Sequence, residues 1–149
     1  MCIMISVIKM KIVVIDAQGG GLGKQIITSL KQKEENIHVI AVGTNSAATA
    51  AMLKAGADEA ATGENAVVVT SRTADIIVGP IGIMIADSML GEISPVMSTA
   101  VAQSNATRIL IPFRHCDTIV VGIHETNTGK LIDEAVTEVL KLIHQEQAG

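Results

Sequence analysis

Short apolar runs alternate with amphipathic stretches along most of this chain. Strands are predicted where apolar residues are contiguous, at residues 11–16, 37–42, 75–78, 108–112 and 118–121, and a further short strand is expected at 58–61. Helices are predicted where apolar residues recur at helical spacing, at residues 22–33, 47–55, 64–72, 84–90 and 95–104, and in a final stripe from Leu131 to Ile143. Strands that alternate with helices form an open, mostly parallel sheet covered by helices on both faces. The pattern therefore predicts a three-layer α/β fold.

The end of the chain departs from this alternation. Only residues 113–117 separate the last two predicted strands, which is too short for the crossover that parallel strands need. We therefore expect a C-terminal strand hairpin, followed by the C-terminal helix. With 149 residues, the chain has room for one domain. We expect a single Rossmann-like α/β domain over residues 10–149 and an N-terminal extension over residues 1–9, because a natural first strand begins near Met10.

The first predicted strand leads directly into a glycine-rich turn, in the stretch VVIDAQGGGLGKQI at residues 13–26. Glycine lets backbone N–H groups approach an anion, and the N-terminus of the following helix adds exposed donors and partial positive charge. The spacing is nearest to the GxxxGxG of short-chain dehydrogenases, with Ala17 in place of the first glycine. The candidate phosphate-binding residues are Gly19, Gly20, Gly21, Gly23 and Lys24. The alternative is a tight turn whose glycines only permit close packing.

Two further loops are expected beside this turn, because ligands of open α/β sheets bind outside the carboxyl ends of the strands. These loops contribute Thr44 and Asn45 after one strand, and Gly79 and Gly82 after another. No Asp or Glu follows the second strand, where dinucleotide folds commonly use an acid to bind the ribose. That absence weakens an NAD assignment and leaves NADP, a mononucleotide or another phosphorylated small molecule. Asp16, at the end of the first strand, would repel a diphosphate unless a cation or a proton intervenes.

Catalytic groups are scarce. The chain has no Tyr, so it cannot use the Tyr general acid of short-chain dehydrogenases, and it lacks a G-x-S-x-G nucleophile motif. The catalytic candidate is Cys116, whose neighbours Arg114 and His115 would favour its thiolate. An ordinary loop is favoured over that interpretation, because the sequence fixes no partner group for the thiol. No metal site is predicted, since His115, Cys116 and His124 lack zinc-site spacing and a fourth ligand.

Composition narrows the class of partner. A net charge of -4 and a single aromatic residue, Phe113, argue against nucleic acid, which needs cationic grooves and stacking platforms. No apolar run approaches the roughly 18 residues of a membrane span, so no membrane partner is expected. The two cysteines are too few for a disulfide framework, which favours the cytoplasm. Apolar residues make up 48% of the chain, which is more than one small domain needs. We therefore expect a homo-oligomer, most simply a dimer, with contacts from residues 83–97.

Four segments of the chain point to a family: KIVVIDAQGGGLGKQI, AVGTNSAATAAMLKAGADEAATGENAVV, ADIIVGPIGIMIADSMLGEISP and RILIPF. They resemble an uncharacterised bacterial family of small Rossmann-like proteins, a domain of unknown function with a D-x-Q-G-G-G-x-G-K start. The resemblance covers nearly all of residues 10–143. That family usually has Gly in place of Ala17 and often has Cys at position 116, whereas Arg114 and His115 differ from it. The resemblance implies the fold and the boundaries, and a ligand site by analogy.

Two functions stay open from the sequence. The first is a cytoplasmic protein that binds a nucleotide or another phosphorylated small molecule at the glycine-rich turn, with oxidoreductase-like chemistry as one form of it. The second is a non-catalytic sensor or oligomeric interaction module whose glycine turn is structural. A catalytic residue would distinguish an enzyme from a non-catalytic module, and Cys116 is the one candidate. The residues therefore do not decide whether the protein is an enzyme.

Overall fold

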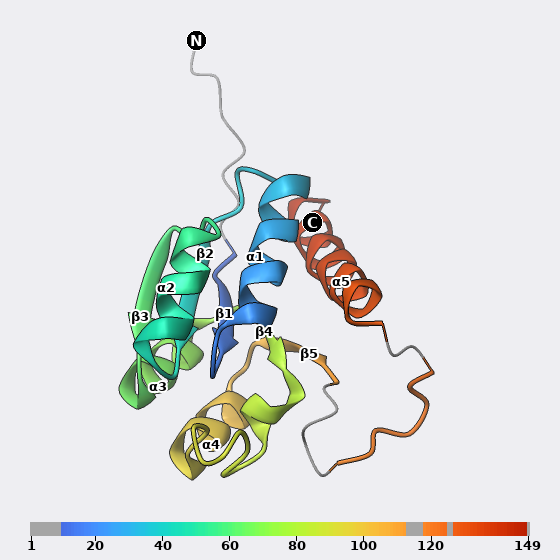
Figure 1. The fold of residues 1–149 in the computed structure, drawn as a ribbon. Helices are drawn as coiled ribbons and strands as arrows, with labels where there is room; N and C mark the ends of the chain where they lie inside the picture. The colour runs from blue at the N-terminus through green and yellow to red at the C-terminus, as the bar shows by residue number, and fades with distance from the viewer. Residues whose placement is uncertain (1–9, 113–117, 125–126, 149) are drawn as a thin grey trace.

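The computed structural model describes residues 10–112, 118–124 and 127–148 (Figure 1). Its strands are β1 (Ile12–Asp16), β2 (Val39–Gly43), β3 (Glu59–Thr62), β4 (Ile76–Pro80) and β5 (Thr107–Ile111). Its helices are α1 (Gly21–Lys33), α2 (Ser46–Lys54), α3 (Glu64–Thr73), α4 (Pro95–Gln103) and α5 (Thr128–Ala148), with a short 3-10 helix η1 (Ile81–Met84) after β4. The alternation of strands and helices confirms the predicted α/β fold.

The strands form one parallel sheet in the order β3-β2-β1-β4-β5. Strand β1 lies in the middle, where Ile12 is in register with Val39 of β2 on one side and with Ile76 of β4 on the other. Every residue of β1, β2 and β4 is buried, because helices cover both faces of the sheet. The strand order reverses between β1 and β4, and such a reversal is where open α/β sheets place their ligands.

Two apolar cores lie on the opposite faces of this sheet. Ile12 and Val14 of β1 pack with residues of α1, α2 and α5, whereas Val13 and Ile15 pack with residues of α3 and α4. Figure 1 shows α1 and α5 lying side by side. The stripe predicted on the first helix is confirmed, since the buried residues of α1 are Leu22, Gly23, Ile26, Ile27 and Leu30. The molecule is therefore the expected three-layer structure.

The predicted C-terminal hairpin is wrong in the part that the structure describes. Residues 118–121 form no strand, and among the described residues β5 is an edge strand that pairs with β4 alone. The apolar, β-branched residues of this segment suggested a strand, but Ile119 and Val121 are 92% and 94% exposed. Strand propensity depends on a neighbouring surface to pack against, and these side chains have none within the described chain. The intervening loop, 113–117, lies outside the described residues.

The helix predicted at residues 84–90 is also wrong. The chain forms η1 and then a series of turns, in which Asp87, Met89 and Leu90 have φ angles of 64°, 55° and 58°. The apolar residues that imitated a helical stripe are used differently, because Ile83 and Ile93 enter the core while Leu90 is exposed. The strand predicted at residues 75–78 extends further, because Gly79 and Pro80 are its last two residues. The segment that follows β4 therefore crosses the end of the sheet as an irregular loop.

Candidate functional site

The carboxyl ends of β1, β2 and β4 bring the predicted loops together. Since β2 and β4 flank β1, the loops that follow them lie on either side of the glycine-rich turn, as expected. Thr44 N–H donates to the Asp16 carbonyl at 3.1 Å, and the Asn45 side chain donates to the Gln18 carbonyl at 2.9 Å. Thr44 and Asn45 thus contact the turn directly. Whether a ligand touches these residues stays a prediction.

Several of the predicted site glycines are required by packing alone. Gly20 has a left-handed φ of 74°, and a Cβ there would lie 2.8 Å from the backbone of Ala48 in α2. A Cβ on Gly23 would lie 2.5 Å from the Met52 sulfur and 3.0 Å from the Asp16 Cβ. A Cβ on Gly79 would collide with the Ile15 carbonyl oxygen. The packing alternative therefore accounts for these three glycines without a ligand.

Gly82 also has a role inside the protein. It is buried at the start of the loop after β4, and its carbonyl accepts a hydrogen bond from the Ser88 hydroxyl at 2.5 Å. This bond fixes the course of the loop over the end of the sheet. Among the described residues, the hydrogen bonds of Gly82 join it to Ser88 and Ile85 rather than to the glycine-rich turn.

Gly19 and Gly21 have no such structural explanation. A Cβ built on either residue would meet nothing within 4 Å, and neither residue has a positive φ. Both are exposed, and no described residue accepts a hydrogen bond from the N–H of either one. Lys24, in the first turn of α1, is exposed beside them. These two glycines present open backbone donors at the N-terminus of a helix.

The buried carboxyl group of Asp16 occupies the inner side of the same turn. Only 4% of Asp16 is exposed. One carboxylate oxygen accepts from Ala17 N–H at 2.8 Å, and the other accepts from Gly23 N–H at 2.7 Å. Burial raises the pKa of Asp16 and outweighs these hydrogen bonds, which lower it, and the nearby Glu92 raises it further. Asp16 therefore caps α1 from within and is easier to protonate than an ordinary aspartate.

A second carboxylate, that of Glu92, reaches the turn from the loop after β4. Its Oε1 accepts from Gln18 N–H at 2.9 Å, from the Thr44 hydroxyl at 2.8 Å and from the Asn45 side-chain amide at 2.8 Å. Burial raises the pKa of Glu92, but these three hydrogen bonds outweigh burial and hold the pKa below its ordinary value. Glu92 is thus an ionised carboxylate over the carboxyl ends of β1 and β2.

The sequence reasoning missed Glu92. A signal was present, because Asp87 and Glu92 are the only charged residues in the apolar stretch 83–97. That stretch was interpreted as an oligomer surface, so the two acids were not connected to the turn. Glu92 places a carboxylate beside Thr44 and Asn45. These residues follow β2, which has no Asp or Glu directly after it.

The other predicted residues add little to the site. Cys116, with Arg114 and His115, lies outside the described residues, and His124 is exposed. Within the described ranges, no group of three or more His, Cys, Asp or Glu residues could hold a metal ion. Among the described helices, none is both long enough and apolar enough to cross a membrane.

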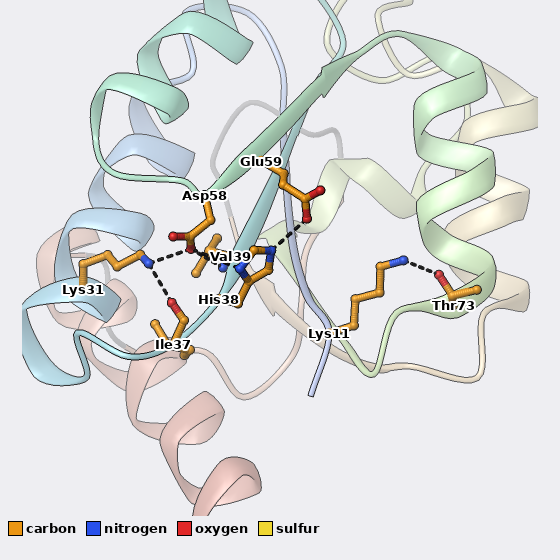
Figure 2. A network of polar contacts seen from close by, with 8 residues as sticks. All are labelled: Lys11, Lys31, Ile37, His38, Val39, Asp58, Glu59 and Thr73. Atoms are coloured by element: carbon orange, nitrogen blue, oxygen red, sulfur yellow. Dashed lines mark hydrogen bonds and ion pairs between the residues drawn. The ribbon is translucent and has the colours of Figure 1, made fainter. Parts of the chain in front are cut away.

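A different polar network lies at the amino ends of the strands, away from the turn (Figure 2). Asp58 accepts hydrogen bonds from the Lys31 ammonium group at 2.6 Å and from Val39 N–H at 2.8 Å. Lys31 also donates to the Ile37 carbonyl, and His38 contacts Glu59 at 2.7 Å. These contacts tie α1 and the start of β2 to the start of β3. The network is therefore explained as structural.

Comparison with known proteins finds a similar solved structure and a family. One solved structure, the crystal structure of a dodecameric FMN-dependent Ubix-like decarboxylase from Escherichia coli O157:H7, is similar with a TM-score of 0.42 and 14% sequence identity. The match covers 91% of this chain and 94% of that one. No curated protein matches the chain. The model of the family described as "Domain of unknown function (DUF3842)" matches residues 11–144, and the chain belongs to this family.

Proposed function

We propose that this protein binds a nucleotide or another phosphorylated small molecule at residues 19–24. The observation that carries the proposal is that Gly19 and Gly21 have exposed N–H groups and open space where a side chain would be. Packing explains Gly20 and Gly23 but not these two. Close approach of a phosphate to the backbone would explain them, because a side chain would obstruct it. Lys24 would supply a positive charge to the same group.

The residues around the turn limit the chemical class of the ligand. Asp16 already accepts a hydrogen bond from Gly23 N–H inside the first turn of the helix. A phosphate would therefore accept hydrogen bonds from the outer N–H groups of Gly19 and Gly21. Thr44 and Asn45 provide neutral hydrogen-bonding groups beside the turn. A groove of about 610 Å³ between α1 and α5 begins at Lys24 and is lined largely by polar side chains. We therefore propose NADP or a mononucleotide as the ligand, with a phosphate on the outer donors of the turn.

A thermal-shift screen with a turn variant tests the proposal. The screen compares NADP, adenine and guanine mononucleotides and inorganic pyrophosphate on the wild type and on Gly21→Val. A ligand at 100 times its Kd should stabilise the wild type by about 2.7 kcal/mol. Gly21→Val should abolish that stabilisation and leave the protein folded, because its side chain would enter open space. Equal stabilisation of both proteins would place the ligand elsewhere.

Two lysine variants serve as a matched pair in the same screen. Lys24 is exposed at the start of α1, and Lys33 is exposed at its end. Lys24→Ala should weaken binding, because it removes a positive charge next to the phosphate. Lys33→Ala removes the same charge from the far end of the helix and should have no effect. Equal losses for the two variants would indicate a general charge effect rather than a site.

The second candidate function is a non-catalytic sensor or an oligomeric interaction module whose turn is structural. The observation that favours it is the packing role of Gly20 and Gly23, together with the two carboxylates that already bind N–H groups of the turn. Under this alternative, no phosphorylated compound in the screen should stabilise the wild type, and Gly21→Val should behave as the wild type does.

A further inference from the structure

The loop that carries Glu92 is anchored in the core at its two ends and is tightly turned between them, with backbone hydrogen bonds of its own. We call residues 85–92 the strap. Ile83 precedes the strap and Ile93 follows it, and both are 1% exposed in the core. Within the strap, Asp87, Met89 and Leu90 have left-handed φ angles, which side chains other than glycine rarely adopt. Leu90 is 99% exposed. The strap is therefore held by its ends, by the Ser88 hydrogen bond to Gly82 and by packing of Met89 against the core. Glu92 connects it to the glycine-rich turn through a hydrogen bond.

Two of the donors that hold Glu92, on Thr44 and Asn45, are positioned by hydrogen bonds that do not involve the strap. Asn45 caps α2, because its Oδ1 accepts from Ala48 N–H at 2.9 Å, and its amide group donates to the Gln18 carbonyl. Thr44 is fixed through its own N–H, which donates to the Asp16 carbonyl. Three donors that converge on one oxygen are an arrangement suited to an anionic oxygen, whichever molecule supplies it. We call Gln18 N–H, the Thr44 hydroxyl and the Asn45 amide the three-donor pocket.

We propose that Glu92 occupies, in the free protein, a position that a phosphoryl oxygen of the ligand takes in the complex. This inference rests on the proposed function, because the three-donor pocket includes the N–H of Gln18, next to the open N–H of Gly19. A phosphate on the turn and the Glu92 carboxylate would repel each other across the same donors. Binding therefore requires the Glu92 side chain to leave the three-donor pocket, and the protein's own carboxylate competes with its ligand.

Isothermal titration calorimetry with inorganic pyrophosphate tests this competition on the wild type, Glu92→Ala and Glu92→Gln. Glu92→Ala should bind pyrophosphate about tenfold more tightly than the wild type, because no internal carboxylate has to leave the pocket. Glu92→Gln should show a smaller gain, since its amide oxygen can still accept from the three donors but carries no charge. If Glu92→Ala binds no more tightly than the wild type, the inference is wrong.

Glu64→Ala is the matched control for charge. Glu64 begins α3 at the same end of the sheet, and its carboxylate accepts from the Ser94 hydroxyl at 2.7 Å rather than from the turn. Its removal deletes one negative charge without opening the three-donor pocket. Glu64→Ala should therefore bind pyrophosphate as the wild type does. A gain equal to that of Glu92→Ala would show a simple charge effect and would overturn the inference.

Gly21→Val separates this inference from the proposed function. If Gly21→Val abolishes binding and Glu92→Ala leaves the affinity unchanged, the proposed function stands and the competition by Glu92 is refuted. If Glu92→Ala binds more tightly and Gly21→Val binds normally, the competition stands and the glycine site is refuted. If neither the wild type nor Glu92→Ala binds pyrophosphate, the competition is refuted, and the nucleotides of the thermal-shift screen decide the proposed function.

Discussion

At the scale of single residues, two aspartates have pKa values shifted in opposite directions. Burial raises the pKa of Asp16. Burial also raises the pKa of Asp58. The hydrogen bonds from Lys31 and from Val39 N–H, together with nearby positive charge, outweigh burial and lower this pKa. The two residues therefore contribute to stability with opposite dependence on pH, which gives each a separate test.

For Asp16, stability should fall as the pH rises. Between the ordinary pKa of about 3.9 and its raised value, the folded protein keeps a proton that the unfolded chain has lost. Its favourable contribution is complete at low pH and is lost as the pH rises through the folded-state pKa. Asp16→Asn should remove this dependence, whatever its absolute stability. Urea unfolding across this pH range measures the free energy of unfolding of the wild type and the variant. Parallel plots of this free energy against pH would contradict the prediction.

For Asp58, stability should fall as the pH is lowered. Its ion pair contributes above the ordinary pKa of about 3.9, and the contribution is lost as the pH falls through the lowered folded-state pKa. Asp58→Asn should be less stable than the wild type near neutral pH, and the difference should shrink in acid. The Asp58 side chain is 35% exposed, so added salt should also reduce the difference. A difference that is constant with pH would contradict this assignment.

The candidate site was only partly predictable from individual residues. Thr44, Asn45 and the glycines of the turn follow strand ends, so a rule about sheets predicted that they lie at one edge of the sheet. Which glycines serve packing could not be predicted, because that depends on Ala48 and Met52, which approach from α2. Glu92 lies 48 residues after Thr44, and a contact over that separation has no local signal in the chain.

At the scale of elements, two adjacent glycines at the start of α1 should respond differently to substitution by alanine. Gly20→Ala should destabilise the protein by about 2–4 kcal/mol, because it combines a left-handed φ with a collision against Ala48. Gly21→Ala should be neutral or stabilise by up to about 1 kcal/mol, since it restricts the unfolded chain and meets nothing in the folded one. Urea unfolding of both variants measures the difference. Similar losses would show that packing constrains both positions.

Elements were predicted well where one face of a regular pattern is buried. The stripes of α1 and α5 repeat over several turns, so the periodicity determines both the helix and its buried face. The pattern misled at residues 84–90 and 118–121, where apolar residues were present without a regular element. In the first, Ile83 and Ile93 are anchors on either side of a loop. In the second, Ile119 and Val121 are exposed in the described chain.

At the scale of the whole molecule, we predict self-association, most simply as a dimer. Within the expected contact region 83–97, Met97 is buried in its own chain, but Leu90 is 99% and Val96 is 51% exposed. Ile119 and Val121 add further exposed apolar surface. Analytical ultracentrifugation at micromolar concentration should show a dimer for the wild type. Leu90→Asp combined with Val96→Asp should shift it toward monomer.

A double-variant control makes the test specific. Leu53 in α2 and Val69 in α3 are 50% and 47% exposed and lie outside the expected contact region. Leu53→Asp combined with Val69→Asp adds the same charge and should leave the dimer intact. A monomeric wild type would refute the prediction of self-association. Equal dissociation by the two double variants would refute the contact region.

The central position of β1 has a consequence for synthesis of the chain. On the ribosome, β1 emerges first and can pair early with β2, yet its other edge must wait for Ile76, with which Ile12 is in register. Until β4 has been made, an apolar strand that is buried in the finished protein stays open along one side. Such edges pair readily with other chains, and pairing between distant segments is slow. Nascent chains that stall between β3 and β4 should therefore be the species most prone to aggregate.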